Sequence, residues 1–287
     1  MRKETAIKKR LFLFAAYDKT GIINPALEYY IKNLFNFGDI IFVMDSDTTP
    51  NEINKICKYT LYANGQRHGE YDFGSYKRAY QWAKSNLDLS TYDYIYLVND
   101  SVFGPLYDID RYFYAMETSG HVAFGIVKNP HHDHPHIQSW FVGTDKKIFT
   151  SDWFDEFMQS ITKLPNKGQI TSKYEHGLSK LITEHNYTWD CLYSVSGRGI
   201  YNKVKKLYKH GVPFIKRISF TRNHGALGGQ IKYILSKIPE NTRNAIITSA
   251  NQQYGEKYMK WFLTKNPIKI AFRNIKHATR KLFIEGI

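Results

Sequence analysis

Asn99, Asp100 and Ser101 follow directly on an apolar and aromatic run, Tyr92–Val98. Such a run is typical of a central strand covered on both faces, and open α/β sheets bind their ligands at the carboxyl ends of the strands. A carboxylate there could hold a divalent cation, Mg²⁺ or Mn²⁺, that bridges two phosphates. The alternative from spacing alone is that Asp100 only caps the turn before Gly104–Pro105.

A second segment, Gly69–Ser75, leads into a run with helical spacing. Ser75 is a candidate cap for a helix over 75–87, and the free N–H groups of its first turn would favour an anion. Gly74 permits close approach of the backbone to a ligand. Asp72 could accept hydrogen bonds from sugar hydroxyls, and Lys77 could reach a phosphate. The simpler interpretation is a glycine turn before a capped helix.

Glu175 lies near the start of a predicted helix, Tyr174–His185. Transfer of a group to a hydroxyl needs a base within hydrogen-bond reach of that hydroxyl, and a carboxylate suits this role. Alternatively, Glu175 only complements the positive end of the helix dipole.

The His-rich run His131–His136 invites a metal interpretation. Adjacent imidazoles in a proline-containing loop rarely meet tetrahedral geometry, so a solvated loop is the expectation. The next strand begins here, and its first polar and aromatic side chains could line a cleft. These residues are His136, Gln138, Ser139 and Trp140.

The elements that must position these residues alternate between short apolar and longer amphipathic runs, which favours a mostly parallel sheet flanked by helices. Asn24, followed by Pro25, caps a helix after the first strand, and Asp108 caps another. Beyond about Thr221 the chain is helical and basic. We therefore expect an α/β domain over 1–220 and a basic helical C-terminal extension over 221–287. The predicted strands are Leu11–Ala16, Asp39–Met44, Tyr92–Val98, Val122–Val127 and Ile137–Val142.

The composition and net charge of the chain restrict the kinds of molecule that it can bind. Of the 287 residues, 43% are hydrophobic and 16% aromatic, which excludes a disordered chain. The formal net charge of +14 predicts an anionic partner: nucleic acid, anionic lipid or a phosphorylated substrate. Lys216 and Arg217, after a Gly/Pro turn, could bind a diphosphate or form a solvated basic turn. Cys57 and Cys191 lack CxxC spacing, and no apolar run reaches membrane length, so we expect the cytoplasm.

Several of these segments, in this order, resemble the rhamnan synthesis protein F family of bacterial polysaccharide glycosyltransferases. They are FAAYDKTGII, GEYDFGSYKRAYQWA, YDYIYLVNDSVFGPL, HIQSWF, KYEHGLSKLI and GVPFIKR, between Phe14 and Arg217. The resemblance implies a GT-A-like, Rossmann-type fold. It also implies transfer of rhamnose or another hexose from a nucleotide-diphosphate sugar to a growing polysaccharide (O-antigen, capsule or rhamnan) on a lipid carrier. By order and spacing together it favours functional roles for Asp72, Asp100 and Glu175.

The resemblance also implies site roles. Glu175 would be the base, and Asn99-Asp100-Ser101 stands where similar enzymes carry Asp-x-Asp. Because only one carboxylate is present, the metal role of Asp100 stays open beside neutralisation by lysine and arginine. The family name favours dTDP-rhamnose as donor. Donor contacts are expected at Tyr17, Asp72, Gly74, Ser75, Lys77, Asn99, Ser101, Lys216 and Arg217, and an acceptor cleft at His136, Gln138, Ser139 and Trp140.

The basic tail, Lys257–Lys281, predicts a helix with one apolar face made by Ile268, Phe272, Ile275, Thr279 and Leu282. Such a helix could rest on anionic lipid at the inner face of the plasma membrane, or pack on the core with its charges solvated. Two rival functions remain: a nucleic-acid-binding protein, favoured by charge and by abundant Tyr and Phe, and a catalytically silent scaffold of a polysaccharide assembly complex.

Overall fold

The computed structural model describes residues 8–222 and 226–264, together with Ala271 and Ile275. Contacts group the described chain into two compact units. The first comprises residues 8–23, 30–100 and 108–196, and the second comprises 24–29, 101–107 and the described residues from 197 onward. The division predicted at residue 220 stays a prediction; by contacts, the second unit begins at Gly197 and includes two short segments of the N-terminal half.

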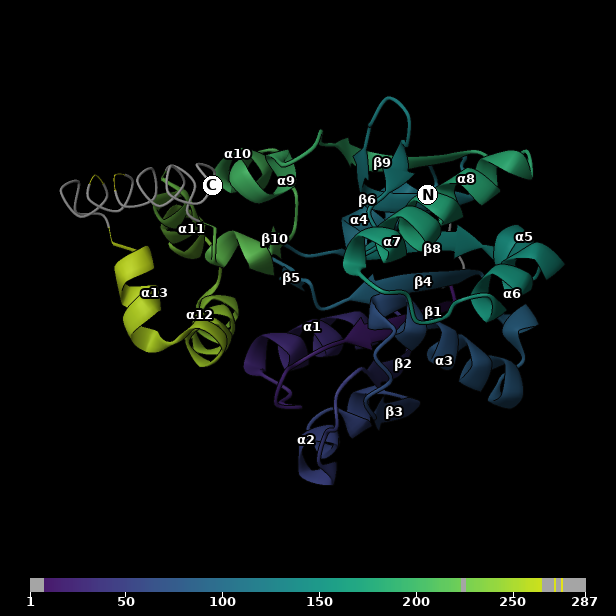
Figure 1. Cartoon of the computed structure of the whole chain (residues 1–287), viewed down its shortest axis with the longest axis horizontal. Helices are drawn as coiled ribbons and strands as arrows, with labels where there is room; N and C mark the ends of the chain where they lie inside the picture. Colours follow the sequence, from purple (N-terminus) through teal and green to yellow (C-terminus); the bar gives the residue numbers. More distant parts are fainter. Residues whose placement is uncertain (1–7, 223–225, 265–270, 272–274, 276–287) are drawn as a thin grey trace, which may run out of the picture. The chain divides into compact units, whose positions relative to one another are not determined.

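The first unit is built on one sheet with the strand order β3-β2-β1-β4-β8-β6-β7, and β9 lies beside β6 (Figure 1). Strands β3, β2, β1 and β4 are parallel, β8 runs antiparallel between β4 and β6, and β9 is parallel to β6. The predicted α/β class with a mostly parallel sheet is therefore confirmed. The strands are β1 Arg10–Ala16, β2 Asp39–Met44, β3 Tyr62–Gly65, β4 Tyr94–Asn99, β6 Ala123–Asn129, β7 His136–Ile137, β8 Phe141–Asp145 and β9 Trp189–Ser194.

Helices of the first unit follow the strands and cover the sheet. They are α2 Pro50–Asn54, α3 Tyr71–Asn86, α4 Asp110–Glu117, α5 Lys146–Phe149, α6 Asp152–Gln159, α7 Lys167–Ile170, a π-helix over Thr171–His176, and α8 Gly177–Glu184, with short 3₁₀ turns at Cys57–Tyr59 and Leu89–Thr91. Helix α1, Pro25–Phe35, begins among the residues of the second unit. Its predicted cap is confirmed, because the Leu27 N–H donates to Asn24 Oδ1 at 3.1 Å.

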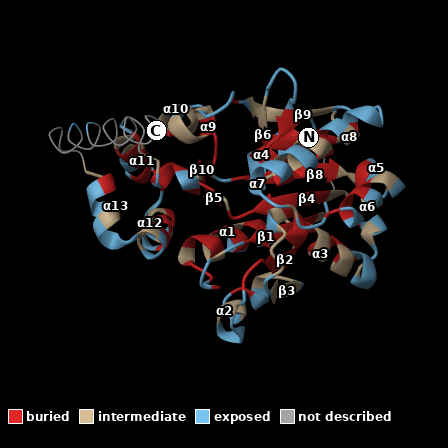
Figure 2. Cartoon of the chain, viewed as in Figure 1, coloured by how far each residue is buried: buried red, intermediate tan, exposed pale blue. Residues whose placement is uncertain are grey.

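The central strands are buried on both faces, which explains their near-continuous apolar sequence (Figure 2). Leu11 and Leu13 of β1 belong to a core cluster that includes the buried face of α3. The alternate residue Phe12 contacts the rings of Tyr96 and Phe113, at centroid distances of 5.3 and 5.7 Å. Successive side chains of one strand thus fill the two opposite cores.

Several predicted elements are wrong in their bounds. The helix predicted over Tyr174–His185 is a π-helix, Thr171–His176, followed by α8. Helix α3 begins at Tyr71, so Ser75 lies inside the helix and is not its cap. The predicted strand Ile137–Val142 is two strands, β7 and β8. A turn separates them, in which the Phe141 N–H donates to Gln138 O and the Trp140 indole N–H donates to Gln138 Oε1 at 2.9 Å. This pairing of polar groups within the turn interrupts the sheet ladder.

The second unit is a small helical body around its own apolar core. Its described residues beyond Thr221 are helical, as predicted. Of the predicted apolar face of the tail, Ile268, Phe272, Thr279 and Leu282 lie outside the described residues, whereas Ile275 is described and is 63% exposed. None of the helices in the described part of the chain is both long and apolar enough to span a membrane. The elements are β5 Val102–Phe103, α9 Gly199–Asn202, α10 Val204–Lys209, β10 Ile215–Lys216, a 3₁₀ turn over Arg217–Phe220, α11 Leu227–Leu235, α12 Glu240–Tyr254 and α13 Glu256–Phe262.

Candidate functional site

Asn99 and Asp100 lie at the carboxyl end of the central strand β4, and both are buried. The Asn99 N–H donates to Trp140 O, and the Asp100 N–H donates to Ala15 O, each at 3.2 Å. These two bonds fix the backbone between the neighbouring strands β1 and β8. The only acidic residue of the Asn-Asp-Ser motif is therefore held at the edge of the sheet where open α/β proteins bind ligands.

The side chain of Asn99 connects β4 to helix α3. Its amide Nδ2 lies 3.1 Å from Asp72 Oδ2 and 3.1 Å from the Tyr76 hydroxyl. Asp72 and Tyr76 occupy the same face of α3, one turn apart, because they are four residues apart in a helix. The predicted site residues Asp72 and Asn99, separated by 27 positions in the chain, are thus in direct contact.

Tyr76 extends this contact towards Glu175. Its hydroxyl donates to Ser139 O at 2.8 Å. Ser139 in turn donates from its N–H and its Oγ to Glu175 Oε1, at 2.8 and 3.0 Å. A continuous chain of hydrogen bonds therefore joins Asp72 to Glu175, and four segments far apart in the sequence meet in it.

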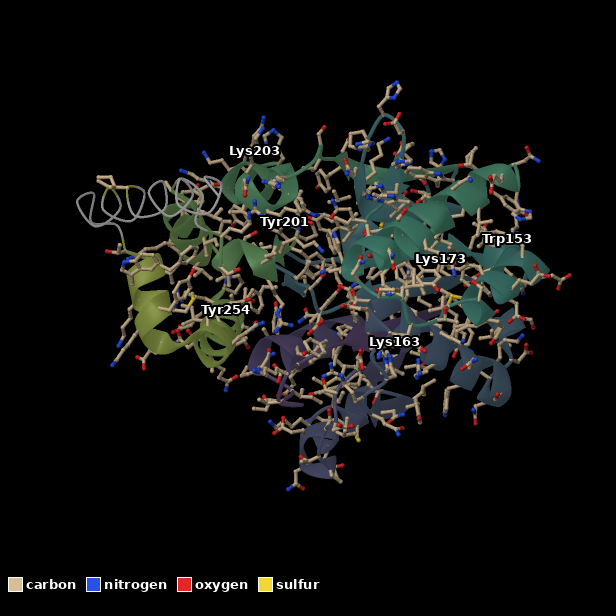
Figure 3. All side chains as sticks on the ribbon, viewed as in Figure 1. Trp153, Lys163, Lys173, Tyr201, Lys203 and Tyr254 are labelled. Carbon is tan, nitrogen blue, oxygen red and sulfur yellow. The ribbon has the colours of Figure 1, made fainter. Side chains whose placement is uncertain are left out.

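A π-helix positions Glu175. Its neighbour Tyr174 is buried, with its ring 5.5 Å from that of Phe73 and its hydroxyl accepting from the Thr162 N–H at 2.9 Å. With Tyr174 held inward, the half-buried Glu175 reaches Ser139. Single π-turns inside helices occur frequently at functional sites. Lys173, two residues earlier, is labelled on this segment in Figure 3.

Electrostatics keep the Tyr76 phenol protonated. Burial raises the pKa of Tyr76 well above its ordinary value, and the nearby Asp72 carboxylate acts in the same direction. A protonated hydroxyl can donate to Ser139 O while it accepts from Asn99. Both hydrogen bonds therefore keep their donor and acceptor roles at neutral pH. Sequence reasoning missed Tyr76, since in the sequence it is only one of the apolar positions of a helix.

The start of α3 differs from the predicted anion site. The Gly74 N–H is not free, because it donates to Glu70 O at 3.2 Å. A Cβ at Gly74 would lie 2.3 Å from Glu70 Cβ, so glycine is needed here for the close approach of Glu70. Ser75 is buried and its Oγ lies 2.9 Å from His68 Nε2. Because the helix begins at Tyr71, Gly74 and Ser75 do not form its start, and donor contacts at these two residues stay a prediction.

The Lys77 side chain is also engaged in bonds other than the phosphate contact that was predicted for it. Its ammonium donates to Gln159 O and Ile161 O at 3.0 and 2.8 Å, at the carboxyl end of α6. These bonds complement exposed carbonyls at a helix end. Phosphate binding by Lys77 stays a prediction, and it requires that these two bonds be released.

A second acidic residue, Asp45, lies at the end of β2 and was missed. It is buried, and its Oδ1 accepts from the N–H groups of His68 and Gly69 at 2.7 and 2.8 Å. Asp45 follows an apolar strand just as Asp100 does, so the same signal could have found it. The adjoining Arg67 guanidinium lies 5.4 Å from the ring of Tyr17, which is 44% exposed. Through these contacts, the loops that follow β1, β2 and β3 pack against one another.

His68 is held neutral in this loop. Its Nδ1 accepts from the Glu70 N–H at 3.1 Å, which leaves the ring proton on Nε2. Burial lowers the pKa of His68. Asp45 opposes this shift and Arg78 reinforces it. The neutral tautomer thus supports the turn that leads into α3 and Asp72.

The predicted cleft residues make three separate sets of contacts. Ser139 binds Glu175, as described, whereas Trp140 is buried and pairs with Gln138. The His136 ring lies 4.2 Å from that of His176, and its Nδ1 donates to His134 O at 2.7 Å. Burial lowers the pKa of His176, and the neighbouring His136 acts in the same direction. An acceptor role for these residues stays a prediction.

The residues present fit a divalent cation shared with a ligand. Throughout the described ranges, no group of three or more His, Cys, Asp or Glu side chains is arranged to hold a metal ion. Mg²⁺ is commonly bound through one or two carboxylates together with substrate phosphates, without an all-protein cage. Asp100 can supply one such carboxylate at the sheet edge.

The remaining predicted donor residues belong to the second unit. Lys216 Nζ donates to Ser101 Oγ at 2.9 Å. Arg217 is buried, and its Nη2 donates to Gln253 Oε1 at 2.8 Å. The guanidinium is thus engaged inside its own unit. Donor binding by Ser101, Lys216 and Arg217 stays a prediction.

The fold and the site define an α/β protein whose acidic residues collect at the carboxyl ends of parallel strands, the place where proteins of this class bind nucleotides. The model of the family "Rhamnan synthesis protein F" matches residues 40–284. The chain belongs to this family. It is thereby placed among proteins of rhamnan and polysaccharide synthesis, and the resemblance found in its segments is confirmed.

Among solved structures, the chain is similar to a putative nucleotide-diphospho-sugar transferase from Desulfovibrio desulfuricans, with 14% identity, a TM-score of 0.40, and coverage of 72% of this chain and 88% of that one. It is also similar to the mannosyltransferase Ktr4p from S. cerevisiae, with 13% identity, a TM-score of 0.34, and coverage of 61% and 64%. No protein of curated function matches the chain.

Proposed function

We propose that the protein is a nucleotide-sugar-dependent hexosyltransferase of the GT-A kind. It would move a sugar from a nucleotide-diphosphate donor to a growing polysaccharide. The observation that carries this proposal is the hydrogen-bond chain from Asp72 through Asn99, Tyr76 and Ser139 to Glu175. It brings a carboxylate suited to proton transfer into one network with polar residues at the carboxyl end of the sheet, where open α/β proteins bind their ligands.

In this reaction Glu175 accepts the proton of the attacking acceptor hydroxyl. The two hydrogen bonds from Ser139 both go to Oε1, so they orient the carboxylate and leave its other oxygen for the acceptor. Asp72, on the neighbouring helix, binds donor hydroxyls. A base held by fixed partners loses little entropy when the acceptor arrives.

Asp100 is the residue that would hold Mg²⁺ or Mn²⁺ together with the donor diphosphate. When bound, the cation would neutralise the charge that develops on the departing diphosphate. Tyr17, exposed at the end of β1, is the proposed contact for the nucleotide. The proposed donor is dTDP-rhamnose and the proposed acceptor is a lipid-linked glycan of O-antigen, capsule or rhamnan type. Such an acceptor would place the protein at the inner face of the plasma membrane.

A thermal-shift series with dTDP, UDP and GDP, each with and without Mn²⁺, tests the proposal. A ligand that binds only the native state at about 100 times its Kd raises the unfolding free energy by about 2.7 kcal/mol. We expect a rise in melting temperature with one nucleotide, larger when Mn²⁺ is present. Hydrolysis of the matching nucleotide sugar would then report turnover. A flat response to all three nucleotides, with no hydrolysis of their sugars, would contradict the proposal.

A further inference from the structure

One long segment of the chain contains no acidic residue. From Cys191 to Pro239 there is neither Asp nor Glu, although acids are frequent elsewhere. The same segment is rich in cations, so it carries a concentrated positive charge. The cations are Arg198, Lys203, Lys205, Lys206, Lys209, Lys216, Arg217, Arg222, Lys232 and Lys237.

Helices α10 and α11 gather part of this charge at one place in the second unit. The two helices are linked, since the backbone N–H of Lys205 donates to the side-chain Oε1 of Gln230 at 3.1 Å. The ammonium groups of Lys205, Lys209 and Lys237 lie 4.3, 5.8 and 6.0 Å from the centroid of the Tyr233 ring. We call these three residues the lysine patch. Lys203, labelled in Figure 3, precedes α10 in the chain.

The elements that carry the lysine patch are packed on the apolar core of the second unit. Val204 of α10 and Ile231 and Ile234 of α11 are buried in the apolar core of the unit. Lys209 and Lys237 are exposed on the outside of these elements. The half-buried Lys205 and the exposed Lys209 on α10, and the exposed Lys237 after α11, are therefore carried by elements that pack on one core.

The patch has no internal counter-charge. Within the described chain, no carboxylate forms an ion pair with any of its three lysines. Lys205 and Lys209 are also four residues apart on one helix, a spacing at which like charges repel. Cation–π contact with one tyrosine offsets this repulsion only in part. An anionic partner outside the chain would relieve it.

We propose that the lysine patch docks the second unit on an anionic lipid surface. Clustered lysines bind such surfaces through the negative headgroup potential. Single-stranded nucleic acid fits less well, because its binding sites combine cations with open aromatic faces. Here Lys205 lies over the Tyr233 ring, and the rings of Tyr107 and Tyr208 stack on each other at 5.0 Å. The partner that fits the lysine patch is a membrane surface with anionic headgroups.

The test is flotation of the full chain with vesicles of phosphatidylcholine alone, or of phosphatidylcholine and phosphatidylglycerol in equal parts. The variant is the triple substitution Lys205→Gln, Lys209→Gln, Lys237→Gln. The matched control is Lys58→Gln, Lys147→Gln, Lys167→Gln, which removes the same charge from exposed positions of the first unit. We expect wild type and control to float with the anionic vesicles only. The patch variant should bind them about tenfold to a hundredfold more weakly.

Equal flotation of the patch variant and the control would overturn the proposal. So would wild type that ignores both vesicle types but binds a single-stranded oligonucleotide through the same lysines. Hydrolysis of a soluble nucleotide sugar separates this proposal from the proposed function. The patch variant should keep wild-type hydrolysis, whereas failure of the transferase proposal would appear as no hydrolysis by any form.

Discussion

Buried charged groups of the first unit are held by partners inside the protein, whereas the lysines of the lysine patch form no ion pair with any carboxylate among the described residues. Arg10 and Glu117 show the first arrangement: Arg10 Nε lies 2.6 Å from Glu117 Oε1, and both side chains are largely buried. The Tyr96 hydroxyl donates to the same carboxylate at 2.7 Å. Glu175 is likewise held by two donors from Ser139. At the patch, three lysines share one ring.

This difference has a physical cause. A charge removed from water must be compensated by a partner, so its position is determined by that partner. A charge at the surface is compensated by water and salt, so like charges can accumulate at a small cost. The first arrangement suits chemistry that needs fixed geometry. The second suits attraction of a large anionic partner.

The largest effect is expected at the two candidate catalytic carboxylates. Asp100→Ala removes the proposed cation or diphosphate contact, and Glu175→Gln keeps the shape of the side chain but removes the base. Each should lower sugar transfer by roughly two to four orders of magnitude. Steady-state transfer with the donor identified by thermal shift measures this loss.

The matched controls are Asp152→Ala and Glu184→Gln, the same changes at exposed positions. They should leave transfer close to wild type. If Asp100→Ala and Glu175→Gln also turn over like wild type, the roles assigned to these carboxylates are refuted.

Stability should separate the two charge arrangements directly. Glu117→Ala leaves Arg10 buried without its partner and should lower the free energy of unfolding by about 3–5 kcal/mol. Removing the three patch lysines should change it by about 0.5 kcal/mol or less per substitution, since none of the three forms an ion pair with a carboxylate among the described residues. Urea unfolding of both variants measures the contrast. Similar losses in the two variants would show that the patch lysines are structural.

Tyr76→Phe breaks the hydrogen-bond chain without changing the shape of the side chain. Ser139 O and Asn99 Nδ2 lose a buried partner, so we expect a loss of about 1–3 kcal/mol in stability. The rate of sugar transfer should fall mainly through kcat, because Glu175 is then no longer joined through Ser139 to Asn99 and Asp72, the proposed donor contacts. Tyr80→Phe, one turn along α3, is the control, since its hydroxyl donates to Phe149 O at 3.5 Å and is not part of the chain from Asn99 to Ser139. Equal kinetics for both variants would remove Tyr76 from the site.

The smallest effect concerns pH and His68. Because burial lowers the pKa of His68 in the folded state, the unfolded chain binds a proton more readily as the pH falls below 6.5. The stability that neutral His68 contributes is therefore fully present above pH 6.5. It is lost as the pH falls from 6.5 towards the lower pKa of His68 in the folded protein. One such group changes the unfolding free energy by at most about 1.4 kcal/mol per pH unit.

Urea unfolding between neutral and mildly acidic pH measures this slope. His68→Gln should reduce it, whereas His132→Gln, in an exposed loop, should leave it unchanged. An identical slope with and without His68 would show that the turn before α3 does not depend on the neutral ring.

Local sequence was sufficient for elements whose signals are local. Strand β2 has the predicted bounds, and the cap at Asn24 forms as expected. The polar group after β4 lies at the predicted edge of the sheet. The start of α3 was missed because no side chain caps it. It follows instead a turn that is held by Asp45, at the end of β2, and by His68 within the turn itself.

By itself, the sequence determined the class of fold, the family segments and the long acid-free stretch, since periodicity, motif order and composition are properties of neighbouring residues. Only the tertiary structure decided that Tyr76 links Asn99 to Ser139, that Ser139 holds Glu175, and that three lysines meet at Tyr233. The partners in the hydrogen-bond chain are between 23 and 63 positions apart. No local pattern records such contacts, because they form only when strands and helices pack.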